Sequence, residues 1–505
     1  MLHIRVLFAA ALFVFSSAAA HAETYDPAPN ITAAQILDRA RTARGTLLPG
    51  AYTRVDRDRV GGIETITTEY MNGNDWLGTY HSGSFTSMSG SYHGQSWSQN
   101  DNGIVTLRSN FRSKVNPNDL AWEHPDDPQY RVRVLGFTQA APREYVVEAN
   151  PPGGVDEYRY YDAQTFLTDR VVRFDTDRYR HVAEYSDYQH VYGRTLAFKE
   201  HDYDGRPQND DVSEIVSFDK TSAPVSLEIP TSRSLLSLSG NAPVTLPARF
   251  SADGIVVRAS VNGRGLDFML DSGASGLFID PAIVHDLGLT PYGRQSETVG
   301  GGDVDIGRVR IPLMSIGSLQ MHDVVFNTTP HNDQTADGRI IGLMGFDLLA
   351  SAVTEIDFKA QTVTVYPRAA FDPQKLGLIA VPLQIDDGIP RVQSSMENVP
   401  GAFLIDTGAF AMLAYKNYVD KLPFAPIDDN DFALGTVGGE MSAQLRTVTD
   451  FIFGGVLFRS AQIVVPSRST FDIPDYDAII GRNALSVFQI YFDYANHMLY
   501  VKRNT

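Results

Sequence analysis

One short pattern occurs twice in this chain of 505 residues, and it constrains the fold more than any other feature. The segment FMLDSGAS occupies positions 268–275, and FLIDTGAF occupies positions 403–410. In both copies apolar residues precede an aspartate, and a small hydroxyl residue and a glycine follow it. A continuous apolar run is typical of a strand buried on both faces. The chain therefore predicts two equivalent units, each of which delivers one carboxyl group at the end of a buried strand, Asp271 and Asp406.

The sequence around these segments repeats as well, in the same order. Asp253-Gly254-Ile255 recurs as Asp387-Gly388-Ile389, TVGGG at 298–302 recurs as TVGGE at 436–440, and RIIGLMG at 339–345 recurs as AIIGRNA at 478–484. The offset between the copies is nearly constant, so chance would have to produce each match in turn. We interpret residues 243–375 and 376–505 as two copies of one lobe.

Each copy contains, in order, an apolar strand, Asp-Ser/Thr-Gly, a glycine-rich hairpin and an element of two apolar residues and a glycine. This order resembles the aspartic proteases, and specifically their retropepsin-like branch, over about residues 243–505. A single Asp-Thr-Gly carries no weight, whereas two triplets with matching downstream elements are a specific signal. The resemblance implies a two-lobed, all-β domain with a cleft at the junction of the lobes, in which an extended peptide or protein substrate is hydrolysed.

The chemistry of such a site follows from its two acids. Carboxyl groups held in contact cannot both ionise cheaply, so the pair keeps one proton, as aspartic proteases themselves exemplify. The carboxylate can take a proton from water while its protonated partner hydrogen-bonds the scissile carbonyl. Asp271 and Asp406 are thus the predicted catalytic residues, as general base and general acid in an order that the sequence leaves open. This scheme needs no metal, cofactor or covalent nucleophile.

The resemblance assigns roles to further residues. Ser272 and Thr407 are expected to hydrogen-bond across the lobe junction, and Gly273 and Gly408 to turn the backbone tightly toward the carboxyl groups. The glycine-rich segments are expected to form two flaps that close on the substrate; they comprise Thr298, Val299, Gly300 and Gly301, and Thr436, Val437, Gly438 and Gly439. The elements expected beneath the site comprise Ile341, Gly342, Ile480 and Gly481. Ser275 is expected to contact substrate.

Two departures from the family pattern limit what can be transferred. Phe410 stands in the second lobe where Ser275 stands in the first, although the family usually has a polar group there. Neither glycine-rich segment contains the tyrosine that is typical of pepsin-like enzymes. We therefore do not transfer pepsin's specificity to this chain.

The first half of the chain has a different pattern. Thr32 and Gln35 form a capping-box pattern before an apolar stripe at 33–40, so a helix is expected to start there and to end near Gly45. Residues 52–220 are short β-like runs separated by turn dipeptides, which favours an antiparallel meander. Segments such as YRYYDAQTFLTDRVVRF resemble the bacterial periplasmic lipoprotein-carrier and lipoprotein-sorting family over roughly residues 30–220. This resemblance implies a curved sheet over a helix that could hold a hydrophobic ligand, an acyl chain or a peptide.

The remaining segments complete a mainly β chain. Residues 1–22 combine Arg5, an apolar run and Ala20-His21-Ala22, which indicates a signal peptide and an exported, periplasmic or secreted protein. The apolar run is shorter than the ~20 residues that span a bilayer, so no membrane span is expected. The predicted order is a signal peptide (1–22), a β domain (23–220), a linker rich in Ser and Pro (221–242) and the two lobes.

Composition excludes several other classes of function. The absence of cysteine excludes disulfides, thiolate metal sites and a cysteine nucleophile. A net charge of −18 without a basic cluster argues against nucleic acid as a partner. Residues 200–211 mimic the spacing of a calcium loop, but the first and last ligand types are wrong, so a hairpin turn is preferred. Because one chain holds both acids, a monomer is sufficient for the site.

Two functions from different classes remain open. The first is an exported aspartic endopeptidase. The second is a non-catalytic periplasmic carrier or sensor that binds a lipid or a hydrophobic peptide. The intact acid pair favours the first, because binding alone would not need it. A serine hydrolase is disfavoured because the chain lacks a G-x-S-x-G elbow.

Overall fold

The computed structural model describes residues 24–28, 30–107, 116–174, 179–221, 225–238, 240–299, 302–330, 333–335, 338–386, 388–423, 431–436, 439–466 and 476–504. Strands dominate these residues, which confirms the mainly β fold. The predicted signal peptide at 1–22 lies outside the described residues. No helix within the ranges given above is long and apolar enough to cross a membrane.

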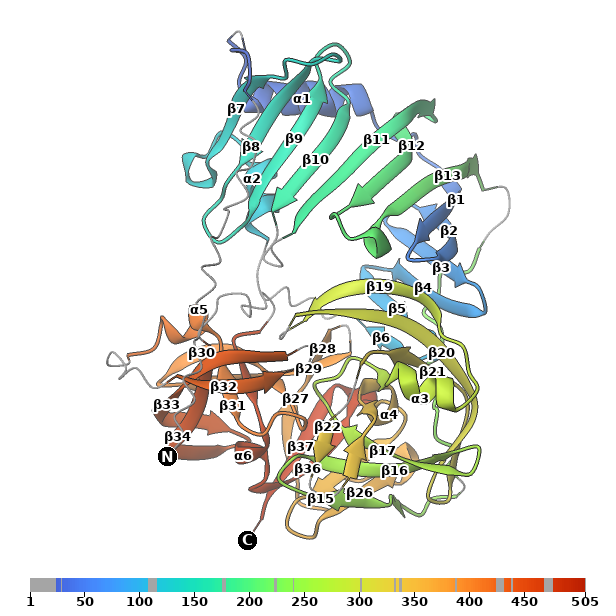
Figure 1. Cartoon of the computed structure of the whole chain (residues 1–505), viewed down its shortest axis with the longest axis vertical. Helices are drawn as coiled ribbons and strands as arrows, with labels where there is room; N and C mark the ends of the chain where they lie inside the picture. Colours follow the sequence, from blue (N-terminus) through green and yellow to red (C-terminus); the bar gives the residue numbers. More distant parts are fainter. Residues whose placement is uncertain are drawn as a thin grey trace, which may run out of the picture.

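Residues 51–220 contain a 13-stranded sheet in the order β6-β5-β4-β3-β2-β1-β13-β12-β11-β10-β9-β8-β7, which we call the N-terminal sheet (Figure 1). All its pairings are antiparallel, and β13 closes the chain back onto β1. Its strands are β1 (Ala51–Val60), β2 (Ile63–Asn72), β3 (Asp75–Ser82), β4 (Phe85–Tyr92), β5 (Gln95–Gln99), β6 (Val105–Leu107), β7 (Val132–Phe137), β8 (Glu144–Ala149), β9 (Asp156–Asp162), β10 (Thr168–Phe174), β11 (Arg180–Val191), β12 (Arg194–Tyr203) and β13 (Asp211–Lys220).

Two helices pack on one end of this sheet, α1 (Ala33–Arg44) and α2 (Pro117–Glu123). The capping box predicted for Thr32 and Gln35 is present, and α1 ends at Gly45 as expected. The buried stripe of α1, which includes Ile36 and Leu37, packs against residues of β8 and β9 such as Tyr145. The sheet over a helix that the resemblance implied is thus the fold of this region.

Carboxyl groups occupy the middle of the sheet face that carries the helices. The guanidinium of Arg159 lies over the ring of Trp122 in α2, so Arg159 points to the face of the helices. Across the neighbouring strands the pairing runs from Arg159 to Val171, and then in turn to Ala183, Asp202 and Asp211. Directly paired residues point to the same face of a sheet, so both aspartates share the face of the helices. The two aspartates make the centre of this face polar.

Two further sheets have one topology. The first lobe has the order β15-β16-β17-β24-β18-β21-β20-β19, and the second lobe has the order β28-β29-β30-β35-β31-β34-β33-β32. In the first lobe the strands are β15 (Ala248–Phe250), β16 (Ile255–Val261), β17 (Arg264–Leu270), β18 (Leu277–Ile279), β19 (Tyr292–Val299), β20 (Gly302–Ile316), β21 (Leu319–Thr328) and β24 (Gly342–Met344). In the second they are β28 (Gln384–Asp386), β29 (Ile389–Met396), β30 (Val399–Ile405), β31 (Met412–Ala414), β32 (Asp431–Thr436), β33 (Gly439–Phe453), β34 (Val456–Pro466) and β35 (Ala478–Ile480).

A six-stranded sheet joins the lobes, in the order β14-β26-β25-β36-β37-β27. Its strands are β14 (Val244–Thr245), β25 (Val353–Asp357), β26 (Thr362–Tyr366), β27 (Ile379–Pro382), β36 (Phe488–Asp493) and β37 (Met498–Arg503). The strand β25 follows the eight-stranded sheet of the first lobe in the chain, and it pairs with β36, which follows the eight-stranded sheet of the second lobe. The remaining short elements are β22 (Asp333–Thr335), β23 (Gly338–Ile340), α3 (Pro281–Asp286), α4 (Phe346–Leu349), α5 (Lys416–Val419), α6 (Arg482–Leu485), η1 (Pro128–Tyr130), η2 (Pro207–Asn209), η3 (Arg368–Ala370) and η5 (Tyr494–Asn496).

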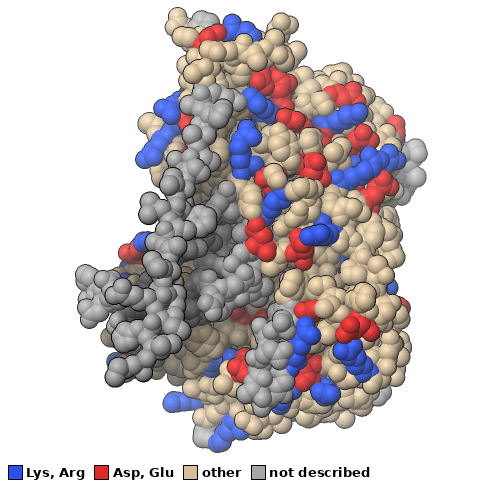
Figure 2. Space-filling view, viewed as in Figure 1, with Lys and Arg blue, Asp and Glu red and all other residues tan. Residues whose placement is uncertain are grey.

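The segment expected to be a linker is packed onto both of its neighbours. Leu227 is buried against Trp97 of the N-terminal sheet, and Leu235 and Leu236 belong to the core of the lobes. Burial of one leucine side chain stabilises a fold by roughly 1.5–3 kcal/mol, so these residues dock the segment. Figure 2 shows acidic and basic side chains interspersed over the face in view, without a cluster of one sign in its described part.

Replacing Asp211 tests the carboxyl groups of the N-terminal sheet. Burial and the neighbouring Asp58 and Asp202 raise the pKa of Asp211 to about 6. A carboxyl group with a raised pKa in the folded state favours folding below its ordinary pKa, and this contribution is lost as pH rises through 6. We expect Asp211→Asn to melt at a higher temperature than the wild type above pH 6, and the difference to shrink toward pH 4. Melting curves across this range measure the effect, with the exposed Asp187→Asn as control. A difference that does not vary with pH would contradict the assignment.

Candidate active site

The two predicted acids meet at the junction of the lobes. Asp271 follows β17 and Asp406 follows β30, and their carboxyl groups are hydrogen-bonded to each other. The backbone N–H of Asp271 donates to the carbonyl of Met344 at 3.0 Å, and that of Asp406 donates to Ile480 at 3.1 Å. Each acid is therefore anchored on the strand that runs parallel to its own, β24 or β35.

The glycines after the acids are required by close approach. A Cβ atom on Gly273 would lie 2.7 Å from Cγ of Asp406, and one on Gly408 would lie 2.6 Å from Cγ of Asp271. Neither glycine has a positive φ, so the expected reason for them, a tight turn, is not the main one. Each glycine leaves room for the acid of the opposite lobe.

Backbone donors and burial set the charge of the pair. Gly273 N–H donates to Oδ1 of Asp271 at 2.8 Å, and the N–H groups of Gly408 and Ala409 donate to Oδ1 of Asp406 at 2.8 and 3.0 Å. Burial and then the carboxyl group of Asp406 raise the pKa of Asp271 well above its ordinary value. The pair can therefore hold one proton at a pH at which an isolated aspartate is ionised.

Ser272 and Thr407 connect the two acid loops by reciprocal hydrogen bonds. Each backbone N–H donates to the other residue's hydroxyl oxygen at 3.0 Å. The Ser272 hydroxyl donates to the carbonyl of Ile405 at 2.7 Å, and the Thr407 hydroxyl donates to that of Leu270 at 2.8 Å. Both side chains are fully buried, so the four bonds are shielded from water and hold the acids side by side.

The structure matches the elements beneath the two acids in a register three residues away from the one that the repeated letters suggested. In the structure Leu270 pairs with Met344, and Ile405 pairs with Ile480. The residue after each partner caps a short helix, so Gly345 is the counterpart of Gly481, and the predicted Ile341 and Gly342 lie at the start of the element. The error arose because the repeated letters Ile-Ile-Gly match at 340–342, whereas the hydrogen-bonding register places 343–345 opposite the acid strand.

Arg482 was missed by the sequence argument. It begins α6, and its guanidinium donates to the carbonyl oxygens of Ala252 and Asp253 at 2.9 and 3.0 Å. Those carbonyls belong to the turn between β15 and β16, so Arg482 connects the second lobe to the first by hydrogen bonds. The unequal letters after the two glycines, Arg-Asn in one copy and Phe-Asp in the other, were the available signal.

Both glycine-rich segments extend hairpins, as far as the described residues reach. In β19–β20 the backbones of Thr298 and Val299 pair with Asp303 and Gly302, and in β32–β33 Thr436 pairs with Gly439. The predicted flap residues Gly300, Gly301, Val437 and Gly438 lie outside the described residues. Next to the acids, Ser275 is exposed and the Phe410 side chain is 54% exposed, so the loop of Asp406 presents an apolar surface.

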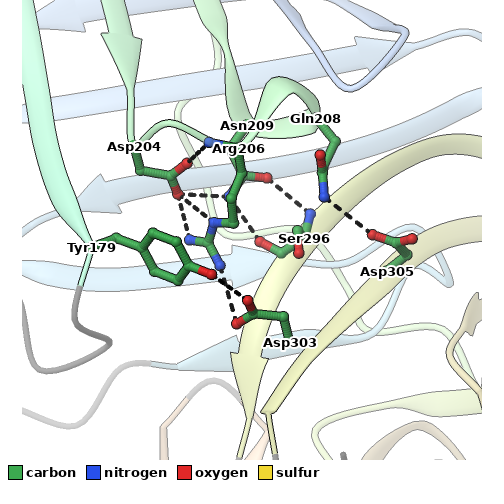
Figure 3. Close-up of polar contacts among 8 residues, drawn as sticks. All are labelled: Tyr179, Asp204, Arg206, Gln208, Asn209, Ser296, Asp303 and Asp305. Atoms are coloured by element: carbon green, nitrogen blue, oxygen red, sulfur yellow. Dashed lines mark hydrogen bonds and ion pairs between the residues drawn. The ribbon is translucent and has the colours of Figure 1, made fainter. Parts of the chain in front are cut away.

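The turn between β12 and β13 binds the hairpin of the first lobe (Figure 3). Arg206 lies between Asp204 and Asp303 of β20, and the Tyr179 hydroxyl also donates to Asp303. The side-chain amide of Asn209 pairs with the backbone of Ser296 in β19, accepting at 2.8 Å and donating at 2.9 Å. The turn between β12 and β13 of the N-terminal sheet thus contacts both strands of the β19–β20 hairpin.

The same turn is the segment whose spacing mimicked a calcium loop. Burial raises the pKa of Asp204, but hydrogen bonds from Arg206 and Asn209 outweigh it and lower the pKa to about 2. Asp204 therefore acts as an anionic acceptor for Arg206 and Asn209, as a hairpin turn allows.

A model of a known protein family matches part of the first lobe. Residues 257–348 match the model of the aspartyl protease family. This match confirms the aspartic protease resemblance of the C-terminal region, and it contains Asp271. A search of curated proteins found no match to the chain.

Solved structures similar to the chain are of two kinds. An aspartic proteinase from Irpex lacteus has 14% identity and a TM-score of 0.34, with 52% of this chain and 98% of that chain covered. A LolA superfamily protein from Nitrosomonas europaea has 12% identity and a TM-score of 0.28, with 38% and 96% covered. A putative outer membrane lipoprotein-sorting protein domain from Vibrio parahaemolyticus has 11% identity and a TM-score of 0.28, with 38% and 93% covered.

Replacing Arg206 tests the contact between the N-terminal sheet and the first lobe. We expect Arg206→Ala to raise amide hydrogen exchange in β19 and β20, because Asp303 loses its cationic partner. The exposed Arg180→Ala serves as control and should leave both strands unchanged. Equal exchange in the wild type and Arg206→Ala would show that the hairpin is held without this contact.

Proposed function

We propose that this protein is an exported aspartic endopeptidase, in which Asp271 and Asp406 activate water to hydrolyse peptide bonds. The observation that carries the proposal is the contact of two carboxyl groups at the junction of two lobes of one topology. The family match over residues 257–348 supports it, and the signal-peptide pattern of residues 1–22 supports export.

The acid pair has the protonation that the reaction needs. Burial and the contact with Asp406 raise the pKa of Asp271, so the two carboxyl groups share one proton in the free enzyme. The ionised carboxylate takes a proton from the water as the water oxygen forms a bond to the scissile carbonyl carbon, and the protonated partner gives its proton to the carbonyl oxygen. Collapse of the tetrahedral intermediate breaks the C–N bond: the proton taken from the water passes to the leaving nitrogen, and one hydroxyl of the intermediate returns its proton to the other aspartate, which restores the shared proton.

The surrounding residues position the substrate. We expect the two hairpins β19–β20 and β32–β33 to close on an extended peptide, which would exclude water and fix the carbonyl group. The exposed ring of Phe410 favours an apolar side chain on the Asp406 side of the scissile bond.

Conservative replacement of the acids tests the catalytic assignment. We expect Asp271→Asn and Asp406→Asn each to lower kcat/KM on an unfolded protein such as casein by about 100-fold or more, because a general acid or base is lost. Asp286→Asn, in exposed helix α3, should retain full activity. Equal cleavage by the wild type and both acid variants would place the activity elsewhere. A wild type that cleaves nothing between pH 3 and pH 9 would instead favour the non-catalytic carrier or sensor.

The pH dependence tests the shared proton. The reaction requires one protonated carboxyl group in the pair, so activity falls as pH rises through the raised pKa of Asp271. We expect the alkaline limb of kcat/KM to reflect the loss of one proton at a pH well above the ordinary aspartate value of 3.8. Measurement of kcat/KM from pH 3 to pH 9 checks this. Loss of activity as soon as pH exceeds about 4 would contradict it.

A further inference from the structure

The second lobe shows what holds the strand after an acid loop in place. Asn483 lies two residues after Gly481, which caps α6, and its Oδ1 accepts from the backbone N–H of Met412 at 2.9 Å. Its Nδ2 donates to the carbonyl of Gln462 at 3.3 Å. One side-chain amide thereby connects β31, which follows the Asp406 loop, to β34.

The first lobe has a carboxyl group at the same place. Gly345 corresponds to Gly481, so Asp347 corresponds to Asn483, and the strand pairings make Val325 the counterpart of Gln462. Asp347 accepts from the backbone N–H of Leu277, as Asn483 does from Met412. An ionised carboxyl group has no N–H to donate, so Asp347 in this form cannot also bond the carbonyl of Val325.

A residue of the N-terminal sheet supplies the missing amide. Asn102 lies in the turn between β5 and β6, and its Nδ2 donates to the carbonyl of Val325 at 2.8 Å and to Oδ2 of Asp347 at 3.3 Å. Its Oδ1 accepts from the N–H of Val325 at 2.7 Å. Asn102 and Asp347 are each only 3% exposed, so these bonds are formed away from water.

The neighbours of Asn102 show that the turn is built into the lobe. The Asn100 amide also donates to Asp347. Arg308 of β20 pairs with Asp101 at 2.9 Å, and the N–H of Arg233 donates to the carbonyl of Gly103 at 2.8 Å. A buried carboxylate without donors would be costly, so the fold of the first lobe is matched to this turn.

The element that carries Asp347 is bonded to the acid loop. The N–H of Phe346 donates to the carbonyl of Ala274 at 3.0 Å, and that of Gly345 donates to Gly276 at 3.0 Å. A Cβ atom on Gly276 would lie 3.2 Å from Oδ2 of Asp347. A displacement of Asp347 would therefore move the loop that holds Asp271.

We infer that Asn102 is a positioning residue for the Asp271 loop: it supplies, from the N-terminal sheet, the side-chain amide that Asn483 supplies within the second lobe. The N-terminal sheet then contributes to the geometry of the candidate active site. The structural part of this inference stands apart from the reaction, and its kinetic part rests on the proposed peptidase function.

The test combines Asn102→Ala with Asp347→Asn. Asn102→Ala should raise amide hydrogen exchange in residues 271–279 and 319–328, and lower kcat about 10- to 100-fold with little change in KM, because the acid is misplaced. The double variant should recover both readouts, because an asparagine at 347 can donate to Val325 as Asn483 donates to Gln462. Asn72→Ala, at the exposed end of β2 in the same sheet, is the matched control and should behave as the wild type.

Several outcomes overturn the inference. They are unchanged exchange in Asn102→Ala, or a double variant no better than Asn102→Ala, which would mean that Asn102 serves only packing. If Asn102→Ala does not fold, Asn102→Asp with and without Asp347→Asn gives the same comparison, because the aspartate at 102 would repel Asp347 but not an asparagine. A wild type without peptidase activity would reject the proposed function, while the exchange measurements would still decide the role of Asn102.

Discussion

The contact between two carboxyl groups is the constraint on which the rest of this structure depends. Two unit charges about 4 Å apart repel by about 4 kcal/mol at an effective dielectric constant of about 20. One shared proton removes most of this cost, and backbone N–H groups stabilise the charge that remains. The two loops must still be held together. Three features do this: the reciprocal hydrogen bonds of Ser272 and Thr407, the hydrogen bonds from Arg482 to the first lobe, and the six-stranded sheet.

The two lobes reach the same geometry by different means. The second lobe secures its acid loop with its own Asn483, whereas the first lobe has Asp347 and draws its amide from Asn102. The β19–β20 hairpin of the first lobe is bound by the turn that contains Arg206 and Asn209. These contacts connect the N-terminal sheet both to this hairpin and to the element that carries Asp347.

Much of the fold could be predicted because its signals are local. The capping box at Thr32 and Gln35 satisfies backbone groups within one turn of helix α1, so neighbouring residues are enough to predict it. The linker is a counter-example: Leu235 and Leu236 sit in a stretch rich in Ser and Pro, and composition does not reveal that a neighbouring core accepts them. The alignment of Gly342 with Gly481 failed for a related reason, since hydrogen-bonding register between distant strands is not encoded by a matching triplet of letters.

The sequence by itself determined that two like lobes exist and that each ends a buried strand with an acid, because strand burial and the Asp-Ser/Thr-Gly triplet are written in adjacent residues. The tertiary structure alone decided that Gly273 and Gly408 make room for the opposite acid, and that Asn102 and Arg206 serve a lobe far along the chain. The roles of the two glycines depend on contacts between residues 133 and 137 positions apart, Gly273 with Asp406 and Gly408 with Asp271, and the roles of Asn102 and Arg206 depend on docking of separate sheets. Patterns in neighbouring residues therefore cannot predict these contacts.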